Sequence, residues 1–291
     1  MSPNSRGALL MMGSMAAFTL NDACIKLVMG HLPLFQILVL RGALTSVLIY
    51  GLARWLGALA FRLPRRDRGL VALRCVAEVG ATYFFLTALS QLPLANVTAV
   101  LQTLPLTVTL GAALFFGEKV GWRRYLAIAA GFLGMLLIVR PGSEGFSIYS
   151  AYVLVAVLFV TLRDLTTRRM SAEVPSLTVT LAAALSVTGF SAVMAVLGGL
   201  WQPMSGADLG LIGTASVFIL GGYLFAVMVM RVGEVSFVAP FRYTGLLWAL
   251  VLGFLVFGHW PEPVVLLGAA IVVAAGLFTF HRERVADAPG R

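Results

Sequence analysis

The chain has 291 residues, of which 60% are hydrophobic and only 11% charged, with a formal net charge of +9. Its mean hydropathy of +0.96 excludes an ordinary water-soluble domain, and its short connecting segments leave no room for a separate one. The sequence pI of about 10.3 would suit a protein that binds nucleic acid. That class is excluded because the basic residues are spread between apolar stretches and not gathered on one soluble face.

Ten apolar stretches follow one another along the chain, each near the ~20 residues that a helix needs to cross the hydrocarbon of a bilayer. They cover residues 7–29, 33–53, 69–90, 94–116, 121–139, 148–168, 175–199, 207–230, 235–257 and 262–280. This pattern predicts an all-α membrane protein with ten transmembrane helices, whose solvent is the lipid bilayer.

Basic residues alternate between the gaps that separate these stretches. Almost every Lys and Arg between the stretches lies in every second gap, with Arg6 before the first stretch and Arg282, Arg284 and Arg291 after the last; the intervening gaps hold one, Arg140. Loops rich in Lys and Arg stay on the cytoplasmic side of a membrane, so the alternation predicts that both termini are cytoplasmic. The same loops should attract anionic lipid headgroups.

The chain also repeats itself. A shift of 141 positions places Phe116-Gly117-Glu118 on Phe257-Gly258-His259 and Gly134 on Ala275. The fourth stretch thus corresponds to the ninth, and the fifth to the tenth. A unit of five helices is odd, so its two copies must cross the bilayer in opposite directions. We expect two inverted repeats, residues 1–141 and 142–291, with a substrate site between them near the midplane.

These features resemble a known family. The paired five-helix units, the Phe116-Gly117-Glu118 motif and the Ala239-Pro240-Phe241-Arg242-Tyr243 segment that opens the ninth stretch are similar to the EamA branch of the drug/metabolite transporter superfamily. The resemblance covers nearly the whole chain. It implies ten helices, cytoplasmic termini, and export of amino acids, aromatic ones among them, or related metabolites across the bacterial inner membrane. His259 departs from the pattern, which would place an acid there.

Ionisable residues inside the stretches are the strongest indication of a functional site. Each costs about 2.5–3.5 kcal/mol near the centre of a lipid-facing helix, so together they must pair or face a wet interior. A spacing of four predicts the ion pairs Asp22–Lys26 and Arg74–Glu78. The neighbours Arg163 and Asp164 point about 100° apart and should find partners elsewhere. The full set has five basic and three acidic members: Asp22, Lys26, Arg41, Arg74, Glu78, Arg163, Asp164 and Arg242.

An excess of positive charge suits a cavity that receives a carboxylate. We expect the cavity to be lined by the first, third, fourth, sixth, eighth and ninth stretches. Arg242 or Arg41 would attract the carboxylate, and Glu78 or Asp22 would receive an ammonium group or a coupled proton. The predicted cavity residues are Asp22, Arg41, Glu78, Thr82, Tyr83, Gln102, Arg163, Asp164, Tyr223, Arg242, Tyr243 and Trp248, whose tyrosines and tryptophan would contact an apolar side chain.

Motifs of catalysis are missing from the sequence. There is no Walker loop, no His-Glu-x-x-His pattern, no Gly-x-Ser-x-Gly elbow and no Cys-x-x-Cys pair, so we expect no enzyme activity, no cofactor and no metal site. The expected function is a secondary transporter that exports amino acids or related small metabolites by alternating access. The alternatives are a multidrug or nucleotide-metabolite carrier of the same fold, and a membrane scaffold or sensor that transports nothing.

The number of copies in the assembly stays open at this point. Small residues form faces on the fifth and tenth stretches, including Gly131, Gly134 and Gly268, and such faces allow close helix contact. They could pack within one monomer or join two copies in a homodimer.

Overall fold

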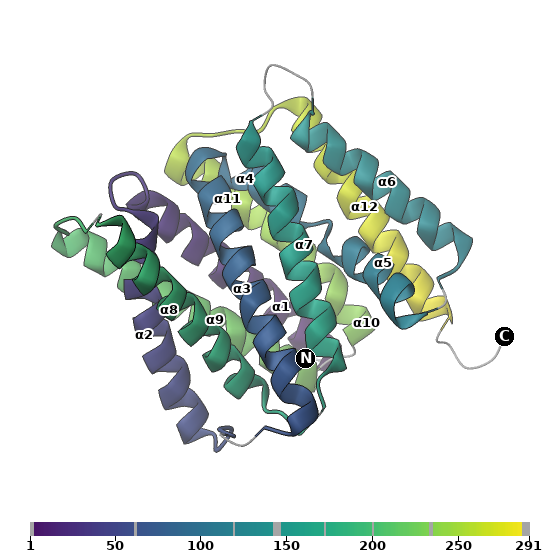
Figure 1. Cartoon of the computed structure of the whole chain (residues 1–291). Helices are drawn as coiled ribbons and strands as arrows, with labels where there is room; N and C mark the ends of the chain where they lie inside the picture. The colour runs from purple at the N-terminus through teal and green to yellow at the C-terminus, as the bar shows by residue number, and fades with distance from the viewer. Residues whose placement is uncertain are drawn as a thin grey trace.

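The computed structural model describes residues 3–60, 63–118, 120–141, 147–171, 173–199, 201–232 and 235–286, and this part of the chain holds helices and short connections but no strand (Figure 1). Ten helical segments are long and apolar enough to span a membrane, which confirms the predicted all-α membrane fold. The elements are α1 (Pro3–Val28), α2 (Leu34–Trp55), α3 (Arg65–Gln91), α4 (Leu94–Leu101), α5 (Leu104–Phe116), α6 (Trp122–Val139), α7 (Ile148–Arg169), α8 (Ser176–Gly198), α9 (Gly206–Val232), α10 (Val235–Val238), the 3-10 helix η1 (Ala239–Tyr243), α11 (Thr244–Phe257) and α12 (Pro263–Ala286).

Two of the ten spans are broken in their interior. The fourth consists of α4 and α5, which meet at Gln102 and Thr103, and the ninth consists of η1 and α11. A proline stands in the first turn of α5 (Pro105) and in η1 (Pro240), where its missing N–H removes a helical hydrogen bond. Irregular backbone at membrane depth is tolerated where protein or a wet cavity surrounds it. The breaks therefore lie where a cavity is expected.

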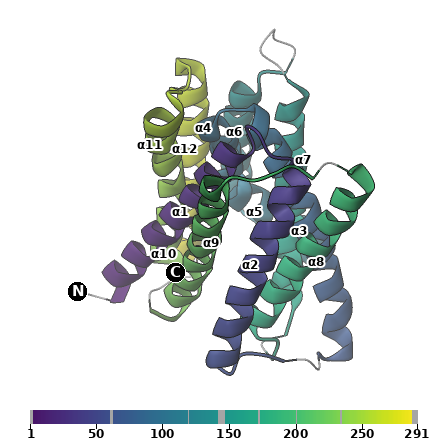
Figure 2. The same cartoon turned by 90° about the vertical axis from the view of Figure 1, so that its left-hand side faces the viewer.

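The helix pairs are symmetric between the two halves: when each span is replaced by its counterpart five spans along the chain, the same set of pairs results. The first span packs on the eighth (α1 on α9) and the third on the sixth (α3 on α7), and adding five to each member turns one pair into the other. The second packs on the seventh (α2 on α8) and the fifth on the tenth (α6 on α12), and each of these pairs maps onto itself (Figure 2). Interlocked inverted repeats produce this pattern. The predicted boundary adjoins residues 142–146, which lie outside the described part of the chain.

The repeated Phe-Gly motif ends a helix in the same way in both halves. Gly117 and Gly258 have φ values of +68° and +64°, the left-handed region that glycine enters without strain. The N–H of Glu118 then donates to the carbonyl of Ala112 at 3.4 Å, and the N–H of His259 to that of Gly253 at 2.9 Å. The motif is repeated because the same cap is required twice.

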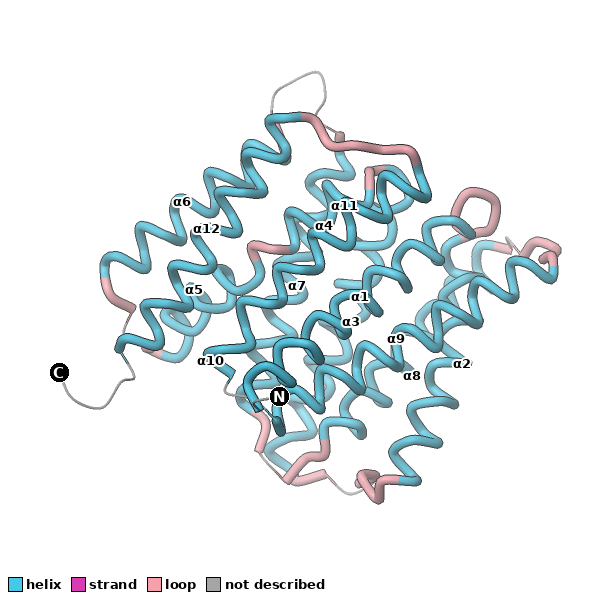
Figure 3. Tube along the Cα trace, turned by 180° about the vertical axis from the view of Figure 1, so that it is seen from behind, coloured by secondary structure: helices cyan, strands magenta, loops and turns pink. Residues whose placement is uncertain are grey.

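Helices α6 and α12 form a tight pair at one edge of the molecule (Figure 3). A Cβ added to Gly134 would lie 2.7 Å from the carbonyl oxygen of Gly268, and one added to Gly268 would lie 2.5 Å from that of Gly134. The backbones can approach this closely only because neither residue has a side chain. The small-residue faces therefore pack on each other inside one chain, which decides between the two arrangements that the sequence allowed.

The two ends of the bundle differ in packing. We call the end with the loops 56–64 and 170–175 the basic face and the other end the opposite face. The largest buried apolar cluster gathers where helix ends meet at the opposite face, with Val28 at the end of α1, Ile37 at the start of α2 and Leu89 at the end of α3. This half of the molecule is closed by apolar contacts. That the basic face is cytoplasmic stays a prediction.

Candidate functional site

A cavity of about 410 Å³ lies on the basic-face side of this apolar core. All six spans that were expected to line it contribute, and α2 adds a seventh wall through Arg41. Arg74 enters it from the third turn of α3, and Arg163 and Thr167 enter from the last turns of α7. A volume in this range is typical of sites for small metabolites.

Nine of the predicted residues meet in this one cavity. They come from six helices and the break between α4 and α5, and they are Asp22, Arg41, Glu78, Thr82, Gln102, Arg163, Asp164, Tyr223 and Arg242. Their side chains come together because each would be costly against lipid and the cavity is where a polar group can reach water. Their role in binding a substrate is addressed below.

Tyr83, Tyr243 and Trp248 do not line the cavity, contrary to the prediction. Tyr83 points about 100° away from Thr82 and stacks on Phe35, with ring centroids 6.1 Å apart. Tyr243 is 6% exposed and packs edge-on against Phe280 of α12. Trp248 is 37% exposed on α11. The sequence marks these rings as aromatic but does not fix how α3 is rotated about its axis or which way the broken ninth span turns Tyr243 and Trp248.

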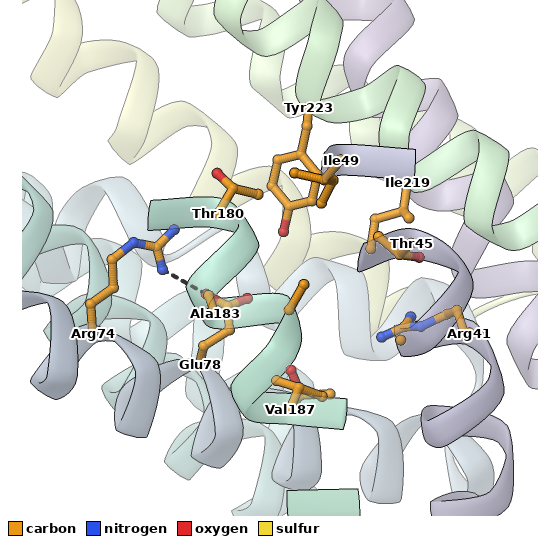
Figure 4. A pocket seen from close by; sticks show the side chains of 13 residues that line it. Arg41, Thr45, Ile49, Arg74, Glu78, Thr180, Ala183, Val187, Ile219 and Tyr223 are labelled. Carbon is orange, nitrogen blue, oxygen red and sulfur yellow. Dashed lines mark hydrogen bonds and ion pairs between the residues drawn. The ribbon is translucent and has the colours of Figure 1, made fainter. Parts of the chain in front are cut away.

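Glu78 lies at the centre of an ion-pair network. Its carboxylate accepts a hydrogen bond from Arg74 Nη1 at 2.8 Å, as the spacing of four predicted (Figure 4). It also lies 3.5 Å from Arg163 Nη1. Arg163 Nε also donates to Asp164 Oδ1 at 2.9 Å. The expectation that Arg163 and Asp164 would not pair with each other was wrong, because the long arginine side chain folds back to its neighbour. Two arginines and two carboxylates thus compensate each other.

Asp22 has a much looser environment. It accepts one hydrogen bond, from Asn21 Nδ2 at 2.8 Å, and Asn21 Oδ1 accepts a long one of 3.4 Å from Arg41. The predicted Asp22–Lys26 pair is absent from the described residues. Lys26 Nζ instead donates to the carbonyls of Leu89 and Leu92, the latter at 2.8 Å. The end of a helix leaves carbonyl groups without a helical partner, and they accept this charge readily.

Arg242 is the cavity arginine without a partner. Within the described part of the chain, its half-buried side chain makes no ion pair and no hydrogen bond, although it lines the cavity beside the η1 break. The cavity holds four arginines and three carboxylates, so its formal charge is +1. Because Lys26 lies outside the cavity, the excess of positive charge in the cavity is one, whereas the full set of ionisable residues in the spans has an excess of two.

A narrow pocket extends the cavity between α2, α3 and α8. It is lined by Arg41, Thr45, Arg74, Glu78 and Tyr223 among others, and the Tyr223 hydroxyl points into it between Arg41 and the Arg74–Glu78 pair (Figure 4). Thr45 Oγ1 and Arg74 Nε are buried there without a hydrogen-bond partner. With a volume of about 50 Å³, the pocket has room for ordered water, which satisfies such groups.

The apolar wall of the cavity was largely missed by sequence reasoning. Met15, Phe18, Leu101 and Leu104 line it, and the ring of Phe18 packs edge-on against Tyr223 at 5.3 Å. A phenylalanine or leucine in a membrane helix has the same composition whether it faces lipid or a cavity. Phe18 could have been found only from its position four residues before Asp22, on the same helix face.

Charged groups gathered in a cavity that seven of the ten membrane-spanning segments line, with one end of the bundle closed, are the features of a transporter of small metabolites. Residues 5–140, slightly less than half of the chain, match the EamA-like transporter family. The chain is similar to this family over its first half, and its ten apolar helices are those of a multi-pass protein of the bacterial inner membrane.

Proteins that are similar to this chain over nearly its whole length are also named as transporters or exporters. It is 29% identical to a riboflavin transporter of Vibrio cholerae, over 96% of this chain and 94% of that protein. It is 26% identical to a pseudopaline exporter of Pseudomonas aeruginosa, over 92% and 94%. It is 22% identical to an S-adenosylmethionine uptake transporter of Rickettsia prowazekii, over 93% and 91%. One solved crystal structure superposes with a TM-score of 0.67 at 16% identity, covering 96% of this chain and 98% of the other, a likeness of fold.

Proposed function

We propose that this transporter exports a zwitterionic metabolite, an amino acid with a large apolar or aromatic side chain or a close relative of one, from the cytoplasm by alternating access. The observation that carries the proposal is Arg242, a cavity guanidinium with no partner in the described structure, while Arg74 and Arg163 are held by carboxylates. A cation without a partner inside a protein cavity attracts a carboxylate, and a guanidinium can bind it through two parallel hydrogen bonds.

The remaining cavity groups fit the other parts of such a substrate. Asp22, which accepts a single hydrogen bond, is available to receive the ammonium group. Phe18, Phe85 and Leu101 offer an apolar surface for the side chain. The network of Arg74, Glu78, Arg163 and Asp164 has no net formal charge and serves to fix the walls.

The direction of transport is supported by the asymmetry of packing. The cavity lies on the basic-face side of the apolar core, and the charge alternation predicts that this face is cytoplasmic. A substrate would then enter from the cytoplasm. In a protein of two inverted repeats, each half can adopt the conformation of the other. This change would close the basic face and open the opposite face.

A larger ring-bearing metabolite is the second candidate. The relatives include a transporter named for riboflavin, and the cavity of about 410 Å³ exceeds the volume of one amino acid. Riboflavin has no carboxylate, so its binding would not depend on Arg242. The two candidates therefore differ in one measurable property.

The test is counterflow of labelled phenylalanine, tryptophan and riboflavin in liposomes that contain the purified protein. We expect saturable flux of the amino acids and a loss of at least about 30-fold in apparent affinity for Arg242→Ala, since losing one partner of a buried charged pair costs 2 kcal/mol or more. Arg54→Ala is the matched control, because Arg54 is exposed at the end of α2, away from the cavity. Riboflavin flux that Arg242→Ala leaves unchanged would select the second candidate, and no flux of any of the three would remove both.

A further inference from the structure

A second hollow lies outside the substrate cavity, on the outer surface of the bundle. It has a volume of about 620 Å³ and runs along α7, with α3 on one side and the end of α5 on the other. Its floor and walls are almost entirely apolar: Leu70, Leu73, Phe115, Leu158, Leu162 and Leu165. We call this hollow the α7 groove.

The α7 groove is long enough to hold much of an extended acyl chain. From Leu158 to Arg169 it follows α7 for about 16 Å, at the helical rise of about 1.5 Å per residue. Leu158 is 66% and Phe115 73% exposed, so both already face the hydrocarbon of the bilayer. An extended acyl chain can therefore lie in the groove without displacing protein contacts.

Two arginines stand at the basic-face end of the groove. Arg66 enters from the first turn of α3 and Arg169 from the last residue of α7. Neither makes an ion pair within 4 Å among the described residues, although the charge of Arg66 acts on the neighbouring Asp67 carboxylate. The guanidinium carbon of Arg169 lies 4.2 Å from the centroid of the Phe116 ring, which holds it at the mouth and leaves its N–H groups to donate. Nearby carboxylates are engaged elsewhere: Asp67 with Ser171 and Glu118 with Arg168, at 3.7 Å.

We propose that the α7 groove is a binding site for one anionic phospholipid, whose phosphate binds Arg66 and Arg169 and whose acyl chain lies along α7. Basic residues at the level of the headgroups above an apolar groove are the chemistry that recognises such a lipid. Arginine binds phosphate through two parallel hydrogen bonds. In a zwitterionic headgroup the ammonium group neutralises part of the phosphate charge, so the arginines bind it less strongly. The site is independent of the identity of the transported substrate.

Native mass spectrometry of the purified, delipidated protein tests the proposal. Phosphatidylglycerol is compared with phosphatidylcholine of the same acyl chains, and inorganic phosphate is added in a separate arm. We expect phosphatidylglycerol to bind at least about tenfold more tightly than phosphatidylcholine, given the free energy of each basic residue near an anionic headgroup. The double variant Arg66→Gln/Arg169→Gln should lose this preference.

The matched control is Arg6→Gln/Arg54→Gln, which removes the same charge from exposed positions near the basic face that lie outside the groove. A second variant, Leu158→Trp, fills the floor, leaves both arginines in place, and should weaken phosphatidylglycerol binding. The proposal would be overturned by equal binding of the two lipids or by an equal loss in the control pair. Full competition by inorganic phosphate, or unchanged binding in Leu158→Trp, would also overturn it.

Discussion

Asp67 and Asp208 lie 141 residues apart in the sequence, and each binds the loop that follows the neighbouring helix, one at each end of the molecule. The Asp67 carboxylate, at the start of α3, accepts hydrogen bonds from Ser171 N at 3.2 Å and Ser171 Oγ at 2.6 Å, in the loop after α7. The Asp208 carboxylate, at the start of α9, lies 2.6 Å from His31 Nε2, in the loop after α1. Each aspartate therefore joins the two members of one tightly packed helix pair, α3 with α7 and α9 with α1.

If these aspartates only hold their helix pairs together, Asp67→Ala and Asp208→Ala should each lower the melting temperature, and the double variant should lower it by the sum. The reason is that the two sites lie at opposite faces and share no partner. Differential scanning fluorimetry of the purified protein measures this. A double variant no worse than the poorer single variant would show that the two sites are coupled. Glu173→Ala, in the same loop as Ser171, controls for loss of a carboxylate.

Glu78→Gln should reduce the free energy of unfolding by about 3–5 kcal/mol, because it leaves two cavity arginines without their shared carboxylate. Denaturant titration in micelles gives the value. Adding Arg74→Gln should recover part of the loss by removing one unpaired charge. Arg242→Ala, which breaks no contact in the described structure, should change stability by no more than about 0.5 kcal/mol. Similar losses in Glu78→Gln and Arg242→Ala would contradict this division of roles.

Asp22→Asn should remove any response of transport to a pH gradient, while exchange at equal pH continues with a weaker apparent affinity because Asp22 also receives the ammonium group. Asp22 has one hydrogen bond and no ion pair among the described residues, whereas Glu78 is held by two arginines. If a proton is carried, it would therefore reside on Asp22, and an amide cannot take it up. Liposome flux with and without an imposed gradient is the measurement. Asp208→Asn, a carboxylate outside the cavity, is the control, and a pH response that survives in Asp22→Asn would contradict the assignment.

Gly134→Ala should lower the free energy of unfolding by about 1–3 kcal/mol, since its Cβ would lie 2.7 Å from the carbonyl oxygen of Gly268 and force α6 and α12 apart. Gly189→Ala in α8 is the matched control, because a Cβ there meets nothing within 4 Å. It should be neutral or slightly stabilising, as alanine favours a helix. Adding Gly268→Ala to Gly134→Ala should cost less than the sum of the two, because both open the same contact.

Local sequence signals were sufficient where the interaction is local. The Arg74–Glu78 pair follows from a spacing of four on one helix, and the caps at Gly117 and Gly258 follow from the repeated Phe-Gly motif. Lys26 shows the limit of this reasoning. Its spacing from Asp22 was equally favourable, yet its ammonium binds carbonyls at the end of α3, a partner that no pattern in α1 can reveal.

The attachments at Asp67 and Asp208 were also missed, although the shift of 141 positions relates them. The sequence assigned no partner to His31, which meets Asp208 across 177 positions. Tyr83 and Trp248 were placed in the cavity by residue type and lie outside it. The misplaced rings depend on the rotation of a helix about its axis, and the missed attachments on contacts between the start of a helix and a distant loop. Both are set by neighbours far away in the sequence.

The sequence by itself determined the ten apolar helices that cross the membrane and the charged loops between them. Lipid imposes these features on any segment, because apolar length and charged loops act on each helix separately. Only the tertiary structure decided which charges compensate each other, that Arg242 is left without a partner in the described residues, and that one end of the bundle is closed. These properties depend on which helix faces meet, and long-range packing sets those contacts.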